Sequence, residues 1–138
     1  MLEPRAIDSW IFSYNPRLGK VKKFVDTHFA EPVSLDTVAG VAGLEKTYFS
    51  KYFHEKTGAC FRDWLSTVRV KRAIEIMMVR DLSITEVAFA VGFQDLRTFE
   101  RTVEKHTGLT PNAVKKQLRL QVELKANPTI RNIPIADD

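Results

Sequence analysis

Three histidines and one cysteine are the residue types in this sequence that most often bind metals or act as nucleophiles. His28, His54 and His106 lie in separate segments, and none has a second His or a Cys at the spacing of a metal-ligand pair. Cys60 has no neighbouring base that would activate its thiol, so we interpret it as a buried thiol at the start of a helix. The glycines are isolated and match no phosphate-binding fingerprint. The sequence therefore predicts no catalytic residue, no metal site and no cofactor, and it argues against an enzyme built around Cys60.

The charge balance favours a polyanionic partner. The chain has 138 residues, 21 Lys and Arg against 17 Asp and Glu, and a formal net charge of +4. Its 44% hydrophobic content is ordinary for one domain that folds around a core.

A single cysteine cannot form an internal disulfide, and no apolar run approaches the roughly 20 residues that span a bilayer. We therefore expect a cytoplasmic protein and exclude membrane insertion and secretion.

Most of the chain shows the apolar periodicity of α-helices, and no strand alternation is visible before Leu118. Cap and stop residues divide the pattern: Ser, Asp or Thr-Pro precede several segments, and Gly follows them. The expected helices are residues 20–31, a short pair between Ser34 and Gly58, a long helix 61–80, a second short pair at 84–91 and 95–106, and a last helix beginning at Thr110-Pro111.

The two ends of the chain differ from its middle. We divide it into an N-terminal extension or linker, residues 1–19, a main domain, residues 20–118, and a C-terminal tail, residues 119–138, that loses the helical rhythm and is expected to be flexible. The extension contains an apolar cluster around Trp10, consistent with one short helix. It could pack on the main domain, form a dimer contact or end a linker from a missing domain.

The most informative feature of the sequence is an internal repeat. The segment 34–39 lies over 83–88 at an offset of 49 residues, and the same offset places Gly43-Leu44 over Gly92-Phe93. One residue inserted in the second turn changes the offset to 50, which then aligns Phe49, Lys51, Thr57 and Gly58 with Phe99, Arg101, Thr107 and Gly108. The chain therefore contains two copies of one structural unit.

Each copy consists of a short capped helix, a turn opened by Gly and a second amphipathic helix, which is the helix-turn-helix arrangement. Ala39 and Ala88 are small where the paired helices must cross closely. The sequence predicts an all-α fold of about seven helices, with two helix-turn-helix subdomains joined by the long linker helix. That linker would be roughly 30 Å long, and successive major grooves on one side of B-DNA lie about 34 Å apart. One molecule could then read two adjacent grooves at an asymmetric site.

Over residues 20–118 the chain resembles the DNA-binding domain of the AraC/XylS family of transcription regulators. It departs from the family pattern at Val103, where Phe is usual, and at Val114-Lys115, where an aromatic residue followed by Arg is usual. The matching residues are Ser34-Leu35, Val38-Ala39, Gly43-Leu44, Phe49-Ser50-Lys51-Tyr52-Phe53, Arg69-Val70, Ala73, Ile76-Met77, Ile84, Val87-Ala88, Val91-Gly92-Phe93, Phe99, Arg101, Gly108, Thr110 and Pro111.

The resemblance implies eight residues that contact DNA. Arg97 and Arg101 are the strongest candidates, because a guanidinium group can bind guanine O6 and N7 together. Glu100 and Glu104 would repel phosphates, so we expect them to face away or to read cytosine. The base-reading positions are Lys46, Thr47, Ser50 and Lys51 on the first recognition helix, and Leu96, Arg97, Thr98 and Arg101 on the second.

The linker helix carries Arg69, Lys71 and Arg72, which could contact the DNA backbone or form salt bridges with Glu75. Of these two roles we favour the structural one.

The expected function is a bacterial-type, sequence-specific regulator of transcription that binds double-stranded DNA, with activation favoured over repression and RNA polymerase as a further partner. The alternative is a helical protein-interaction module, such as an anti-activator, that kept the fold and lost its affinity for DNA. The chain could be a small stand-alone regulator, or a ligand-sensing or dimerisation domain could lie upstream of it.

Overall fold

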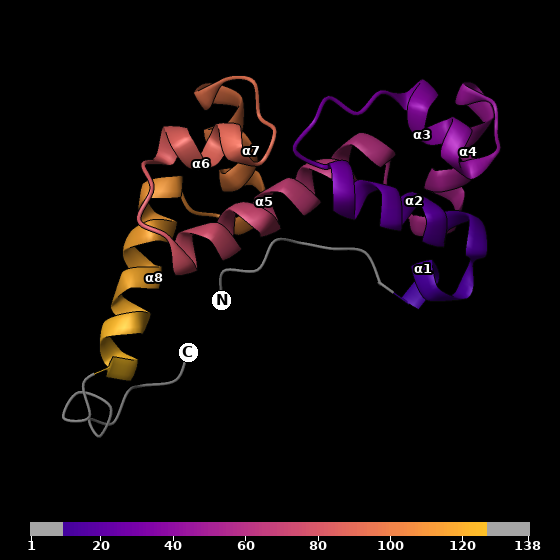
Figure 1. Ribbon diagram of the computed structural model, residues 1–138. Coiled ribbons are helices and arrows are strands. Elements are labelled where there is room, and N and C mark those ends of the chain that lie inside the picture. The colour runs from indigo at the N-terminus through magenta and orange to yellow at the C-terminus, as the bar shows by residue number, and fades with distance from the viewer. Residues whose placement is uncertain (1–9, 127–138) are drawn as a thin grey trace.

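The computed structural model describes residues 10–126, and this part of the chain contains eight α-helices and no strand (Figure 1). The long helix α5 runs through the middle of the molecule. One group of helices packs around its beginning and a second group around its end, so that the molecule has two lobes. The helices are α1 (Trp10–Tyr14), α2 (Pro16–His28), α3 (Leu35–Ala42), α4 (Lys46–Thr57), α5 (Phe61–Val79), α6 (Ile84–Ala90), α7 (Leu96–Thr107) and α8 (Pro111–Ala126).

The first lobe is built on aromatic side chains. Phe49 and Phe53 of α4 are fully buried, with ring centroids 5.8 Å apart. Phe12 of α1 stacks on Trp64 of α5 at 5.0 Å, so the short N-terminal helix contributes directly to this core. Aromatic pairs add to the free energy gained by burying their area. The lobe therefore holds α4 by several large contacts rather than by one.

The second lobe has a largely aliphatic core. Val70, Ala73 and Met77 from the second half of α5 meet side chains from α6, α7 and α8. Phe99 of α7 is fully buried and its ring lies 5.2 Å from that of Phe93. Val103 is also fully buried, which shows that a smaller side chain than the usual Phe is accommodated in this core. The two ends of α5 thus serve two separate cores.

The internal repeat extends to individual hydrogen bonds at the helix ends. The Thr57 hydroxyl donates to the carbonyl oxygen of Phe53 at 2.8 Å and accepts from the backbone N–H of Ala59 at 3.2 Å. Thr107 does the same with Val103 at 2.7 Å and Leu109 at 3.1 Å. In both copies the Thr-Gly pair closes the second helix of the unit, as the aligned sequences predicted.

The structure differs from the sequence-based expectation at both ends. Helix α2 begins at Pro16 rather than Lys20, because Asn15 accepts a hydrogen bond from the backbone of Leu18 at 3.1 Å and Pro occupies the first helical position. Helix α8 continues through the alternating segment after Leu118 to Ala126. The parts of the predicted extension and tail at residues 1–9 and 127–138 lie outside the described residues.

One smaller expectation was wrong. Cys60 is exposed rather than buried, because it is the N-cap residue of α5 and its side chain makes no capping hydrogen bond. Within residues 10–126, no helix combines the length and the apolar content that crossing a membrane would require.

Candidate nucleic-acid interface

Helices α4 and α7 are the second helices of the two repeated units, and each begins with an acidic cap. The Glu45 carboxylate accepts from the backbone N–H of Tyr48 at 3.1 Å, and that of Asp95 from Thr98 at 2.7 Å. These bonds satisfy backbone donors that the first turn of a helix leaves free. The turns before them contain Gly43 and Gly92, whose φ angles of 73° and 102° favour glycine. The same local chemistry therefore starts both helices.

The surroundings of both cap residues favour the ionised carboxylate and lower its pKa. Hydrogen bonds from the backbone of Thr47 and Tyr48 lower the pKa of Glu45, with Lys46 contributing less. The backbone and hydroxyl of Thr98 lower the pKa of Asp95, and the charges of Arg101 and Arg97 lower it further. Both acids are consequently ionised at neutral pH, and each lies beside the cations at its helix start.

Seven of the eight predicted contact residues lie on α4 and α7 away from the two cores, whereas Leu96 packs partly against the core of the second lobe. Lys46, Thr47, Lys51, Arg97 and Arg101 are exposed. Ser50, Leu96 and Thr98 are partly buried. In the described part of the chain none of the four cations in this set forms a hydrogen bond or an ion pair, so their charges are available to a ligand.

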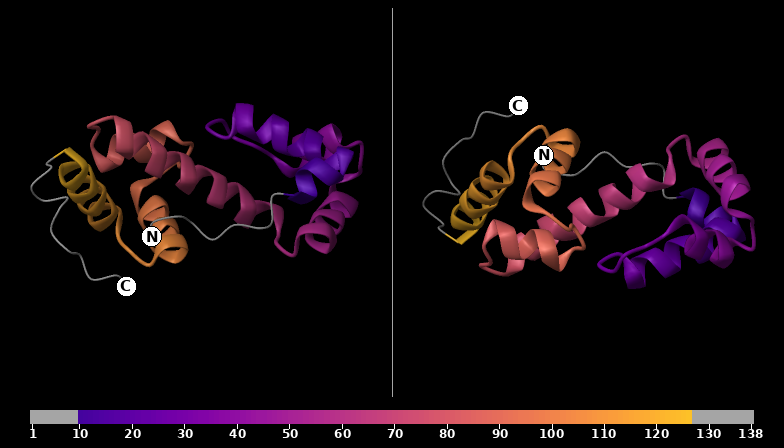
Figure 2. Two further views of the ribbon diagram at one scale, coloured as in Figure 1. Left: turned by 90° about the horizontal axis from the view of Figure 1, so that it is seen from below. Right: turned by 90° about the horizontal axis from the view of Figure 1, so that it is seen from above.

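The buried faces of α4 and α7 determine which of their faces are exposed to solvent. Phe49 and Phe53 anchor α4 in the first core, and Phe99 and Val103 anchor α7 in the second. Figure 1 shows α4 and α7 on the same side of α5, above it in that view, and Figure 2 shows them toward different ends of α5. Two anchored helices with exposed cations in their first two turns thus lie on one side of the molecule, at different points along α5.

One residue of this surface was missed from the sequence. Tyr48 is not among the predicted contact residues, but its side chain is 54% exposed and its ring centroid lies 6.2 Å from that of Tyr52. The repeat itself contains the signal, because the offset of 50 places Tyr48 over Thr98, a predicted contact residue. Helical periodicity alone could not separate it from the buried Phe49.

Of the other charged residues on the two lobes, some are exposed and some form contacts within the protein. Glu100 and Glu104 are exposed on α7 and have no ion-pair partner among the residues described. On α5, Arg72 forms the expected ion pair with Glu75 at 3.3 Å. Arg69 does not pair with Glu75 and binds backbone carbonyl groups instead. The structural role favoured for this part of the linker helix therefore holds for both arginines, by two different kinds of contact.

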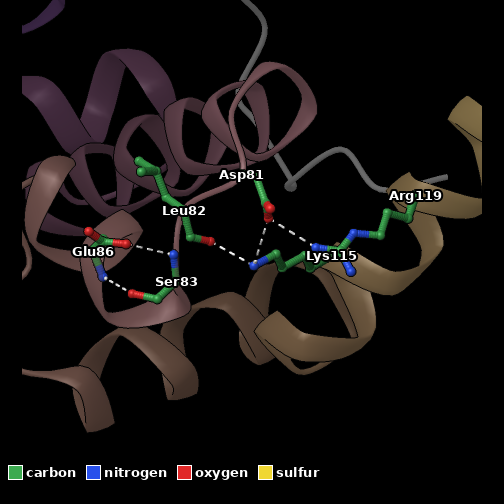
Figure 3. Close-up of polar contacts among 6 residues, drawn as sticks. All are labelled: Asp81, Leu82, Ser83, Glu86, Lys115 and Arg119. Carbon is green, nitrogen blue, oxygen red and sulfur yellow. Dashed lines mark hydrogen bonds and ion pairs between the residues drawn. The ribbon is translucent and has the colours of Figure 1, made fainter.

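Cations of α8 anchor the loop before α6 (Figure 3). The Lys115 ammonium group donates to the carbonyl oxygen of Leu82 at 2.7 Å, and Arg119 pairs with Asp81 at 3.0 Å. Directly after this loop, Ser83 and Glu86 form a reciprocal capping box at the start of α6. Because α6 packs against α7, these contacts brace the second recognition helix. Lys115, which stands where the family pattern usually has Arg, thus makes its contacts within the protein.

Two helix-turn-helix units on a shared linker helix define the class of fold, and comparison with known proteins defines the family. A family model described as a helix-turn-helix domain matches residues 38–117, which is more than half of the chain. The structure resembles an AraC-type DNA-binding domain protein from Chromobacterium violaceum with a TM-score of 0.72 and 23% identity, covering 77% of this chain and 95% of that one. The chain belongs to the AraC-type helix-turn-helix family.

Further similarities extend to a transcriptional factor and to two regulatory proteins. The DNA-binding domain of AdpA, a global transcriptional factor solved in complex with a target DNA, has a TM-score of 0.71 and 27% identity, covering 76% of this chain and 95% of that one. The regulatory protein PocR of Salmonella typhimurium is 28% identical over 105 residues. YobQ, an uncharacterized HTH-type transcriptional regulator of Bacillus subtilis, is 27% identical over 95 residues.

These relatives are longer proteins. The match covers 76% of this chain but 35% of PocR, and 69% of this chain but 39% of YobQ. The similarity therefore concerns somewhat more than a third of each of these proteins and not the whole of either.

Proposed function

We propose that the protein binds double-stranded DNA sequence-specifically and regulates transcription, by inserting α4 and α7 into successive major grooves. The observation that carries this proposal is the pairing of two capped helices with free exposed cations on one side of α5. With 19 residues, α5 is about 28 Å long, close to the roughly 34 Å repeat of the duplex. The AdpA domain, which has a similar fold and was solved in complex with a target DNA, supports DNA as the ligand.

The outer faces supply the contacts in this proposal. Arg97 and Arg101 lie one turn apart on α7, where each guanidinium group can bind the edge of a guanine. The exposed part of Leu96, which also packs against the second core, meets a thymine methyl group. Thr98 presents its methyl group and its hydroxyl oxygen, which can still accept because its hydrogen is donated to Asp95. On α4 the corresponding contacts come from Lys46, Thr47, Ser50 and Lys51, to which we add Tyr48.

The remaining roles follow from the class of regulator. We infer that residues 20–118 form the DNA-binding unit, that the protein acts in the cytoplasm where the chromosome lies, and that it is a regulator rather than an enzyme. Activation through contact with RNA polymerase is the proposed outcome of binding. A ligand-sensing or dimerisation domain upstream is consistent with the greater length of PocR and YobQ.

Selection of bound sequences from a pool of random duplexes tests the proposal. We expect a bipartite, asymmetric motif with half-sites about one helical turn apart. The affinity for the selected duplex should fall with salt, with a log–log slope of about −0.9 for each phosphate neutralised.

The double variant Arg97→Ala, Arg101→Ala should lose the α7 half of the motif. If no motif emerges and no duplex binds at low salt, the proposal fails, and a protein-interaction module becomes the better description of this fold.

A further inference from the structure

The two lobes are joined by more than the covalent continuity of α5. Near the middle of that helix, the Arg69 side chain reaches across to the loop between α2 and α3. Its Nε donates to the carbonyl oxygen of Phe29 at 2.8 Å, and its Nη2 donates to that of Glu31 at 3.0 Å. Two donors of one planar guanidinium group thus hold two carbonyl groups of one loop, 38 and 40 residues away in the chain.

The turn of the second helix-turn-helix unit lies against the same contact. A Cβ atom on Gly92 would lie 2.8 Å from the Phe29 carbonyl oxygen, 3.0 Å from Arg69 Nε and 3.1 Å from the Ala30 Cα. Because these neighbours are mostly backbone, a side chain at this position would push the loop away. Arg69 therefore lies where the α2–α3 loop of the first lobe meets the α6–α7 turn of the second.

Phe29 completes this junction. Its ring is partly buried and packs against the cores of both lobes, the only residue shared by the two clusters among those described. The Arg72 guanidinium group lies over the ring at 5.4 Å from its centroid. We define the interlobe junction as Phe29, Ala30, Glu31, Arg69, Arg72 and Gly92.

The environment of Arg69 distinguishes it from a surface cation. Burial lowers the pKa of its guanidinium group, and the charge of Arg62 acts in the same direction. No carboxylate among the described residues pairs with it, so its hydrogen bonds to carbonyl groups are its recorded polar contacts. A partly desolvated cation whose donors satisfy the α2–α3 loop is placed to hold that loop, not to meet a phosphate.

We propose that Arg69 is a positioning residue that locks the angle between the two lobes and so sets which spacing of half-sites the protein accepts. This inference rests on the proposed function. One base pair more or less between half-sites moves them by about 3.4 Å and turns one against the other by about 34°. With the junction intact, the two lobes could not reorient to match the altered spacing. With the junction loosened, they could.

The test measures affinity against spacing. The duplex selected by the wild-type protein is rebuilt with one or two base pairs inserted or removed between its half-sites, and each duplex is titrated by fluorescence anisotropy. We expect the wild-type affinity to fall about tenfold or more at the first altered spacing, comparable to the cost of a mismatched base pair. Arg69→Ala should bind the optimal duplex less tightly and show a profile that is flatter across the spacings.

Three further variants separate positioning from other roles. Arg69→Lys keeps the charge but can reach only part of the carbonyl pair, so its profile should be intermediate. Gly92→Ala changes no charge, disturbs the junction and strains the turn before α7 because of its positive φ, and it should also flatten the profile. Lys71→Ala is the matched control, since Lys71 is exposed two residues along α5 and has no hydrogen bond or ion pair with any residue in the range 10–126. Circular dichroism melting of each variant establishes that it is folded.

The outcomes are distinct. If the wild-type protein selects no motif, the proposed function itself fails. If the wild type selects a motif and Arg69→Ala weakens every spacing by the same factor, Arg69 is a phosphate contact and the positioning role is overturned. An unchanged Gly92→Ala profile in a folded protein would overturn it as well. Should Arg69→Ala fail to fold, the profiles of Arg69→Lys and Gly92→Ala decide the question.

Discussion

The Asp95 carboxylate accepts both hydrogen-bond donors of Thr98. Oδ1 accepts the backbone N–H of Thr98 at 2.7 Å, and Oδ2 accepts its hydroxyl group at 3.0 Å. The first turn of α7, which carries Leu96 and Arg97, is therefore fixed in the absence of DNA. Its cations can then enter a groove without first paying the entropy of ordering the backbone.

The Asp95 cap leads to the first prediction. Asp95→Ala removes both bonds, so we expect a lower thermal unfolding midpoint and a smaller preference for the selected duplex over a scrambled one. Asp95→Asn is the matched control, since asparagine caps a helix about as well without the charge. It should keep the midpoint near that of the wild type. Equal destabilisation in both variants would mean that the charge, and not the cap, stabilises this turn.

The exposed arginines of α7 give the second prediction. Arg97→Ala or Arg101→Ala should weaken binding to the selected duplex by about 1–3 kcal/mol, the discrimination that one bidentate contact with guanine provides. The loss should be confined to one base pair of the motif for each variant. Lys23→Ala removes an exposed cation on α2 and serves as the control. Equal losses on specific and scrambled duplexes would show that the arginines contact phosphates only.

The third prediction concerns the core that holds α7. Phe99 is fully buried against Phe93, and its replacement by alanine should lower the free energy of unfolding by about 3–5 kcal/mol. Urea unfolding measures this change. Leu96→Ala, at a partly buried position on the same helix, should cost less. A loss for Phe99→Ala below that of Leu96→Ala would mean that the second lobe repacks around the cavity.

Much of this architecture could be predicted because the sequence contains the same structural unit twice. Ser34 and Ser83 cap the first helices of the two units, Gly43 and Gly92 open their turns, and the observed helices follow those marks. Local signals of this kind act over three or four residues, so a single sequence contains them in full. The two helix-turn-helix subdomains and the linker helix that joins them could be predicted from these signals.

The missing details depend on contacts that are distant in the chain. The bonds from Arg69 to the α2–α3 loop span about 40 residues and leave no periodic pattern in the sequence. The end of α8 was misplaced for a different reason: the alternation of Leu118, Leu120 and Val122 resembles a strand, yet Leu120 and Val122 are exposed on a helix. Because these apolar residues are exposed, the segment lacks the amphipathic pattern from which a helix is predicted.

His106 gives the last prediction, because its protonation opposes folding. The ring is partly buried on α7, and burial lowers its pKa below 6.5; Lys105 acts in the same direction and Asp63 against it. The unfolded chain therefore binds a proton more readily than the folded protein does. The stability that this histidine contributes is complete above pH 6.5 and declines as the pH falls through its lower folded-state pKa.

Thermal melts at pH 7.5 and about pH 5 should consequently differ less for His106→Gln than for the wild type. The effect should be modest, since a partly exposed ring is screened by water. The matched variant is His54→Gln, which changes an exposed histidine on α4. Should His106→Gln lose as much stability on acidification as the wild type, or more, then burial of the neutral ring does not contribute to the acid sensitivity of the second lobe.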